Sequence, residues 1–97
     1  MASARYSEDA QLDLDEILHF SKLRWNNEQA RRYLRKLRDA SRMLAKSPRI
    51  ARPFGRSRPD LRRYEVGSHV IFFRVEPGGI FVVRILHEHM LPQKHLG

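Results

Sequence analysis

The sequence predicts an α+β fold in which an αα-hairpin packs on one face of a small antiparallel β-sheet. Nearly all the β-forming residues gather between Asp60 and Met90, where two turn signals separate three short strands. Before that segment, apolar residues recur at helical spacing as far as Ser47. A length of 97 residues allows one hydrophobic core, so we expect a single domain over residues 1–97.

The first helix is expected to begin after Ser7, a suitable N-cap, because Glu8 and Asp9 then fall in the first turn, where the helix dipole favours negative charge. One face at helical spacing predicts the buried side and comprises Ala10, Leu14, Ile17, Leu18 and Ser21. A second apolar set points roughly the opposite way and comprises Leu12, Phe20 and Leu23. A surface helix with one buried side does not need this second set.

We expect this helix to end at Trp25, with Asn26 in a left-handed capping conformation and Asn27 as the N-cap of a second helix. The second helix should end at Ser47, because the residue before a proline is disfavoured in helical conformation. Its apolar stripe consists of Ala30, Tyr33, Leu34, Leu37, Ala40 and Leu44. The stretch from Pro48 to Pro59 has neither helical nor strand periodicity, and we interpret it as a basic loop that is either a solvated connector or a binding surface.

Within the sheet, Gly67-Ser68 predicts a two-residue hairpin, which sets the register of the flanking strands. The predicted pairs are Val66 with His69, Tyr64 with Ile71, and Arg62 with Phe73. The face expected to contact the helices holds Tyr64, Val66, Ile71, Phe73 and Val75. The other face mixes apolar and charged groups like a partly open binding face, and holds Leu61, Arg63, Glu65, Val70, Phe72 and Arg74. The Pro77-Gly78-Gly79 turn fits two or three residues, which leaves the face of Arg84 open.

Composition narrows the class of protein and its surroundings. The chain has no cysteine, which excludes disulfides and thiolate metal sites and favours the cytoplasm. It shows no apolar stretch of the roughly 20 residues that span a bilayer and no signal peptide, so we expect no membrane association. The formal net charge is +8, with acidic residues between Ser7 and Glu16 and most of the Lys and Arg between Arg31 and Arg63. Such a charge suggests an anionic partner.

The sequence contains no complete catalytic or cofactor-binding motif. His87 and His89 alternate on a strand end, as a metal or acid-base pair would, but no carboxylate or cysteine set completes a metal site. Solvated or hydrogen-bonded histidines are the simpler interpretation. RNA cleavage by arginines and a histidine stays open. We therefore expect no cofactor.

Several spaced residues together resemble the ParE toxins of the RelE/ParE superfamily. They are Ala10-x-x-Asp13-Leu14-x-x-Ile17, Trp25-Asn26-x-x-Gln29-Ala30 with Tyr33 and Leu37, Gly55-Arg56, Leu61-Arg62-x-Tyr64-x-x-Gly67-x-His69-Val70-Ile71-Phe72-Phe73-Arg74, and Arg84-Ile85-Leu86-His87-x-x-Met90. The resemblance implies a β-αα-βββ fold in which residues 4–6 form an N-terminal strand. It also implies a plasmid- or chromosome-encoded type II toxin that is neutralised by a ParD-like antitoxin and inhibits DNA gyrase, with indirect contact to DNA through gyrase.

The resemblance favours a toxin that is not an enzyme over the alternative, a RelE-like ribosome-dependent mRNA interferase. Where RelE-type members have an arginine after the hairpin this chain has His69, and its tail lacks a tyrosine. The candidates for the interferase alternative are Arg62, Arg63, Arg84 and His87. A third hypothesis is a nucleic-acid-binding module that uses the surface of residues 31–63, with steeply salt-dependent binding.

Two sets of site residues follow from these hypotheses. The expected antitoxin-binding residues are Leu12, Phe20, Leu23, Arg63, Phe72 and Arg74. The expected gyrase-binding residues are Trp25, Arg84, His87 and His89. Two structural alternatives stay open: the apolar groups of the first helix could pack on the N-terminal segment, and Trp25 could be buried as a staple of the hairpin.

Overall fold

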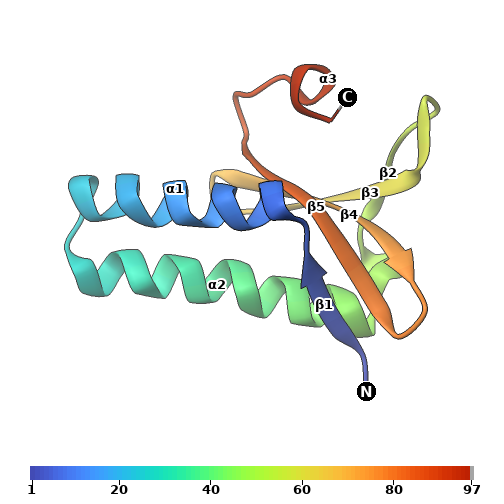
Figure 1. Cartoon of the computed structure of the whole chain (residues 1–97), viewed down its shortest axis with the longest axis horizontal. Helices are drawn as coiled ribbons and strands as arrows, with labels where there is room; N and C mark the ends of the chain where they lie inside the picture. The colour runs from blue at the N-terminus through green and yellow to red at the C-terminus, as the bar shows by residue number, and fades with distance from the viewer. Residues whose placement is uncertain (97) are drawn as a thin grey trace.

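The computed structural model describes residues 1–96 and contains two long helices and a five-stranded sheet (Figure 1). The elements in chain order are β1 (Ser3–Tyr6), α1 (Glu8–Arg24), α2 (Asn27–Lys46), the 3₁₀ turn η1 (Pro48–Ile50), β2 (Arg52–Gly55), β3 (Arg58–Val66), β4 (His69–Glu76), β5 (Gly79–His87) and α3 (Pro92–His95). The N-terminal strand, helical hairpin and three-stranded meander confirm the α+β class and the β-αα-βββ order.

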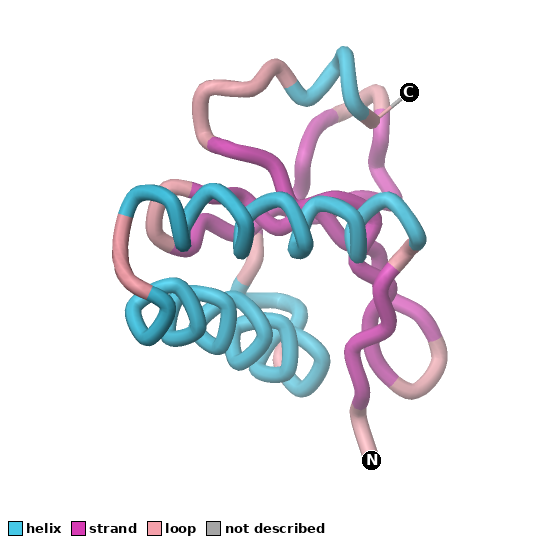
Figure 2. The backbone as a smooth tube through the Cα atoms, turned by 60° about the vertical axis from the view of Figure 1, so that its left-hand side comes forward, coloured by secondary structure: helices cyan, strands magenta, loops and turns pink. Residues whose placement is uncertain are grey.

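The sheet has the strand order β1-β5-β4-β3-β2, and α1 and α2 lie together against one of its faces (Figure 2). β1 pairs with β5 in parallel, so the sheet is mixed rather than antiparallel throughout. This pairing brings the chain's first strand beside its last. A Cβ on Gly79 would lie 1.8 Å from the carbonyl oxygen of Ser3, so only glycine permits β1 to approach this close.

The helical hairpin follows the prediction except at its turn. Ser7 caps α1 by accepting a hydrogen bond from the backbone N–H of Ala10 at 2.9 Å. Trp25 is the C-cap of α1, as predicted. The left-handed conformation predicted for Asn26 is wrong: its φ is −89°, and its side chain accepts from the N–H of Gln29 at 2.8 Å as the N-cap of α2. The predicted N-cap Asn27 is also wrong, since it is the first residue of α2: Trp25 and Asn26 are both extended, and they alone connect the two helices.

The hairpin register between β3 and β4 is confirmed, with Val66 opposite His69, Tyr64 opposite Ile71 and Arg62 opposite Phe73. The predicted helix-facing side holds as well, apart from Val75, which is 53% exposed. The main core combines that face with the buried stripes of both helices and includes Ala10, Leu14, Ile17, Leu34, Leu37, Leu44, Val66, Ile71, Phe73, Ile80, Val82 and Ile85. Burying these side chains is the main stabilisation of the hairpin on the sheet.

The interpretation of residues 48–59 as a loop is wrong. The segment forms η1 and then β2, which pairs antiparallel with β3, and Arg62 donates to the carbonyl oxygen of Ala51 at 2.8 Å. β2 is four residues long and contains Pro53 and Gly55. Its sequence shows no alternation of apolar and polar residues. The strand forms because it pairs with β3, and its own β propensity is low.

The second face of the sheet is not the open face that we expected. Leu61, Val70 and Phe72 are 0%, 4% and 1% exposed. A small second cluster forms there from Val70, Phe72 and Leu86, with Phe54 of β2 and Leu96 after α3 packed against it. The projecting β2–β3 arm and the C-terminal segment thus cover the middle of this face.

The long helices are too polar to cross a membrane, and none of those formed by residues 1–96 meets the length and hydropathy needed for a span.

Candidate functional site

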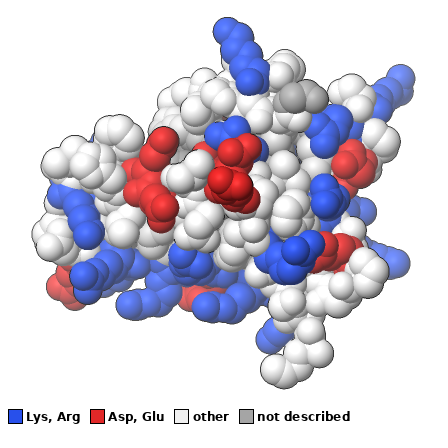
Figure 3. Space-filling model, in the orientation of Figure 1, with Lys and Arg blue, Asp and Glu red and all other residues white. Residues whose placement is uncertain are grey.

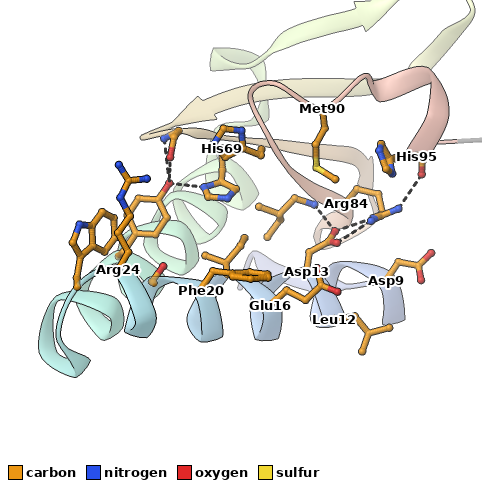
Figure 4. A pocket seen from close by; sticks show the side chains of 17 residues that line it. Asp9, Leu12, Asp13, Glu16, Phe20, Arg24, His69, Arg84, Met90 and His95 are labelled. Atoms are coloured by element: carbon orange, nitrogen blue, oxygen red, sulfur yellow. Dashed lines mark hydrogen bonds and ion pairs between the residues drawn. The ribbon is translucent and has the colours of Figure 1, made fainter.

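A cleft of about 580 Å³ opens between α1, the end of the sheet at β4 and β5, and the C-terminal segment. Figure 4 shows its walls: Asp9, Leu12, Asp13, Glu16 and Phe20 project from α1, and the other side carries residues that include His69, Arg84, Met90 and His95. The cleft therefore combines segments from both ends of the chain. Apolar, acidic, basic and imidazole groups all reach it.

Asp13 attaches α1 to the sheet at the floor of this cleft. Its carboxylate accepts from Nε and Nη2 of Arg84, both at 2.8 Å, and from the backbone N–H of Ile85 at 2.9 Å. The two side chains are 11% and 18% exposed, so the pair is largely removed from water. The hydrogen bonds that Arg84 donates to Asp13 raise the pKa of Arg84 above its ordinary value. The charges of both side chains are thus committed mainly to each other.

The position of Arg84 follows from an irregularity in β5. The register between β4 and β5 shifts between Phe72 and Phe73, which pair with Arg84 and Val82 and leave Val83 unpaired. A bulge of this kind re-aims the neighbouring side chain. Arg84 accordingly reaches Asp13 on one side and donates to the carbonyl oxygen of His95 at 3.1 Å. Arg84 therefore lies between α1 and the C-terminal segment. The length of the Pro77-Gly78-Gly79 turn had left the position of Arg84 open.

The far end of the cleft is organised around Tyr33 of α2. Its hydroxyl lies 2.6 Å from Nδ1 of His69 and accepts from the backbone N–H of Ser68 at 3.1 Å. A Cβ on Gly67 would lie 2.8 Å from the Tyr33 ring, so the hairpin turn needs glycine for space as well as for its φ of 58°. The tyrosine therefore connects α2 to the β3–β4 turn.

His69 is an uncharged imidazole near neutral pH. Partial burial, followed by the nearby His87, lowers the pKa of His69 from 6.5 to about 4. The rings of His69 and His87 have centroids 5.4 Å apart, and those of His87 and His89 are 5.0 Å apart. Within residues 1–96, no group of three His, Cys, Asp or Glu side chains is placed to hold a metal ion.

Apolar side chains along α1 and at the hairpin tip remain exposed to solvent. Leu12, Phe20 and Leu23 are 54%, 63% and 72% exposed, and Trp25 is 42% exposed with its ring edge-on to Tyr33 at 5.8 Å. Neither structural alternative removes them from water, because more than half of each of these α1 side chains is exposed and the indole is not fully buried. Such a set on one side of a small protein is typical of an interaction surface.

The residues predicted to bind the antitoxin and those predicted to bind gyrase do not form two separate surfaces. Leu12 and Phe20, from the antitoxin set, line the cleft together with Trp25, Arg84 and His87 from the gyrase set. Leu23 and His89 are exposed but do not line the cleft. The cleft is thus shared between the two sets.

The remaining antitoxin candidates lie elsewhere. Phe72 is buried under Phe54, with ring centroids 5.3 Å apart, so it has almost no surface to offer a partner in this conformation. The guanidinium of Arg63 lies over the Phe72 ring at 5.9 Å, and that of Arg74 lies over the Phe81 ring at 4.5 Å. Arg63 borders a separate cavity of about 620 Å³ between the β2–β3 arm and the C-terminal segment.

Sequence reasoning assigned no site role to Asp13, Tyr33 and Met90, which line the cleft, although all three are among the residues that carry the family resemblance. Asp13 had a recognisable signal, because it interrupts the apolar stripe formed by Ala10, Leu14 and Ile17. A carboxylate on a buried helix face needs a partner. The place of Met90 in the cleft depends on the path of the chain after β5, which no local pattern predicts.

Comparison with known proteins identifies the family. A family model described as ParE toxin of type II toxin-antitoxin system, parDE, matches residues 4–92. Toxin ParE1 of Caulobacter vibrioides is 39% identical over 97 residues, covering 100% of both chains. Toxin ParE1 of Mycobacterium tuberculosis is 42% identical over 97 residues, covering 97% of this chain and 99% of that protein.

Structural comparison supports the same fold. The chromosomal ParDE toxin-antitoxin system of P. aeruginosa aligns with a TM-score of 0.75 at 23% identity, covering 90% of this chain and 96% of that one. The RelBE2 toxin-antitoxin complex of Mycobacterium tuberculosis aligns with a TM-score of 0.63 at 15% identity, covering 89% and 96%. With the full-length sequence similarity, these findings establish that the chain belongs to the ParE toxin family of type II toxin-antitoxin systems.

Proposed function

We propose that this toxin acts in the cytoplasm by binding DNA gyrase and trapping its cleaved-DNA complex, and that a ParD-like antitoxin neutralises it. The observation that carries the proposal is the similarity to ParE1 toxins, which are 39% and 42% identical to this chain and cover 100% and 97% of it. The toxin supplies a binding surface in this mechanism, and gyrase supplies the chemistry.

The state of the charged groups supports a role without catalysis. A nuclease needs a free cation to hold the scissile phosphate and a group that exchanges protons near neutral pH. Arg84 is held by Asp13, and Arg62 donates to the carbonyl oxygen of Ala51. His69 has a pKa of about 4, so it does not charge in the physiological range. Two of the four interferase candidates, Arg62 and Arg84, are therefore engaged within the protein, and His69, which stands where RelE-type members have an arginine, supplies no positive charge near neutral pH.

For the antitoxin, the exposed apolar set on α1 is the favoured contact. Leu12 and Phe20 border the cleft, and Leu23 continues the apolar strip toward the hairpin tip. An amphipathic segment can insert apolar side chains against such a strip. The same surface explains why a free toxin would keep its apolar groups exposed, since the antitoxin covers them until it is removed.

For gyrase, the favoured contacts are Trp25 at the hairpin tip and the histidines at the end of β5. Trp25 combines a large exposed ring with a fixed position against Tyr33, as interface anchors do. His87 lies at the mouth of the cleft and His89 is exposed. Arg84 contributes by positioning the C-terminal segment through the carbonyl oxygen of His95.

A gyrase assay with the purified protein tests the proposal directly. We expect loss of supercoiling and accumulation of cleaved plasmid as toxin is added, and Trp25→Ala should weaken both at least tenfold while circular dichroism stays unchanged. Met43→Ala, which trims an exposed apolar side chain of α2, is the matched control and should behave like the parent. Unaffected gyrase at a large excess of toxin would refute gyrase as the target. Codon-dependent cuts in a translating extract would instead indicate the RelE-like mRNA interferase.

A further inference from the structure

A stripe of arginines runs along one flank of α2, where three of the four are exposed and Arg38 is half-buried with its guanidinium 5.6 Å from the centre of the Tyr6 ring. Arg31, Arg35, Arg38 and Arg42 recur at intervals of four, three and four residues, so they lie on one line of the helix. At about 1.5 Å of rise per residue, the line is about 16 Å long. In the orientation of Figure 3, Lys and Arg gather along the lower side of the molecule, over α2.

The stripe is only weakly neutralised by the protein itself. In the part of the chain that the structure describes, Arg42 forms an ion pair with Asp39 at 2.6 Å, whereas Arg31, Arg35 and Arg38 have no carboxylate within 4.0 Å. Asp15 of α1 is the one acidic residue that borders the groove along the stripe. Like charges three and four residues apart repel each other on a helix. Helix stability therefore does not explain this arrangement, and an external polyanion would relieve the repulsion.

The chemistry of the groove favours a phosphate backbone over a protein. The apolar residues that border it are mostly covered: Leu14 and Leu34 are 1% and 8% exposed. Protein interfaces are built around buried apolar or aromatic anchors, which this flank does not offer. Guanidinium groups, in contrast, bind phosphate oxygens in a bidentate manner and need no apolar contact. The exposed apolar anchors of this molecule lie instead on α1 and at Trp25.

We infer that the arginine stripe of α2 binds the phosphodiester backbone of duplex DNA directly and without sequence preference. One DNA strand carries a phosphate about every 3.4 Å of axis, so a line of about 16 Å lies beside roughly five phosphates. The four arginines can contact most of them. This binding belongs to the toxin itself and does not depend on gyrase, although a DNA-held toxin would be concentrated near any enzyme that acts on DNA.

The test is the salt dependence of binding to a labelled duplex of about 30 base pairs, measured by fluorescence anisotropy with the full chain. For the parent we expect the logarithm of the association constant to fall with the logarithm of salt concentration at a slope of about −4. The variant R31Q/R35Q/R38Q should reduce that slope to about −1 and weaken binding at low salt by roughly 100-fold. Glutamine keeps the helix propensity, and a thermal melt checks the fold.

A matched control separates the stripe from the total charge. K36Q/R56Q/K94Q removes the same number of positive charges from three exposed positions outside the stripe and should keep a slope near −4. Equal loss in both triple variants would overturn the inference, since net charge alone would then account for binding. Parent protein with no measurable DNA binding at low salt would also overturn it, as would a stripe variant that loses only antitoxin or gyrase binding.

A single charge reversal, R35E, guards against misfolding of the triple variant. It should weaken DNA binding by about tenfold or more at low salt and leave gyrase capture in the absence of DNA unchanged. Gyrase capture without DNA tests only the proposed gyrase binding, and the salt slope tests only the DNA binding of the stripe. The two proposals can therefore fail separately. If R35E left the salt dependence of DNA binding unchanged, this result would contradict the inference that the stripe binds DNA.

Discussion

Helices α1 and α2 lie side by side on the same sheet but use their residues in opposite ways. α1 carries five acidic and two basic residues, buries Asp13 and Ser21, and exposes Leu12, Phe20 and Leu23. α2 carries two acidic and seven basic residues and buries an almost wholly apolar stripe. α2 is thus attached to the sheet mainly by packing, apart from the hydrogen bonds of Tyr33 to the β3–β4 turn, whereas α1 adds a largely buried ion pair to a smaller apolar contact. Its remaining apolar side chains are left on the surface for a partner.

The outer surfaces of α1 and α2 are therefore suited to different kinds of partner. Hydrogen bonds and an ion pair help to hold α1 on the sheet, so some of its apolar residues can lie outside the core. These exposed apolar residues are suited to a protein partner. A helix held by packing can carry cations over its whole outer side, which suits a polyanion. Four measurements, in decreasing order of expected effect, test whether the two helices differ in this way.

The largest effect is expected from removing the polar anchor of α1. Asp13→Ala should lower the free energy of unfolding by about 3–5 kcal/mol, because it leaves Arg84 largely buried and without its carboxylate. Urea denaturation measures the change. Asp15→Ala, at an exposed position of the same helix, should stay within about 0.5 kcal/mol. A loss below about 1 kcal/mol for Asp13→Ala would mean that α1 is held by packing, like α2.

A pair of leucine truncations tests the packing side of the comparison. Leu37→Ala in α2 should cost about 3 kcal/mol, since Leu37 is 0% exposed and the change leaves a cavity. Leu23→Ala in α1 should cost no more than about 0.5 kcal/mol, because that side chain is 72% exposed. Both are measured by urea denaturation. Similar costs at the two positions would remove the distinction between a buried and a displayed leucine.

The cleft end where Tyr33 of α2 meets His69 should be sensitive to acid. Because the folded-state pKa of His69 is lowered to about 4 from 6.5, the unfolded chain binds more protons between those values, and stability falls as the pH drops through that window. The loss should be about 1–2 kcal/mol, reduced by the partial exposure of the ring.

His69→Gln should remove this part of the acid sensitivity when melting temperature is followed from about pH 7 to pH 4. His19→Gln, on the exposed side of α1, is the control and should leave the profile as it is. A His69→Gln profile that coincides with the parent would show that the imidazole is not kept neutral by folding.

The smallest effect concerns the junction that separates the two helices. Asn26→Ala should destabilise the protein by about 1 kcal/mol, because the N–H of Gln29 loses its capping oxygen. Asn27→Ala, one residue later, should change stability much less, since Asn27 is already inside α2. Thermal or urea unfolding of the two variants compares them. The reverse order would restore Asn27 as the cap.

Much of the architecture was predictable because it rests on local patterns. The N-cap at Ser7, the end of α2 at Ser47 and the register from Gly67-Ser68 all follow from turn and capping chemistry confined to a few neighbouring residues. The exposed apolar set on α1 was also visible, because helical spacing alone separates Leu12, Phe20 and Leu23 from the buried face.

The errors share a different cause. β2 exists because β3 offers it a pairing edge, and Phe72 is buried because β2 and the C-terminal segment return to cover it. Asn26 was assigned a C-terminal capping role, but the short turn places it as the cap of the next helix. In each case the deciding contact comes from another segment, which no local pattern describes.

The sequence by itself determined the fold class, the two helices and the register between β3 and β4, since periodicity and turn chemistry act over short distances, and its spaced residues carried the resemblance to the family. Only the tertiary structure decided the site. It brought Asp13 to Arg84 and Ile85, placed Tyr33 against His69, and moved Phe72 out of reach of a partner. The physical reason is that buried charge pairs and shared clefts form between residues distant in sequence, where the energy of a contact depends on what the rest of the chain removes from water.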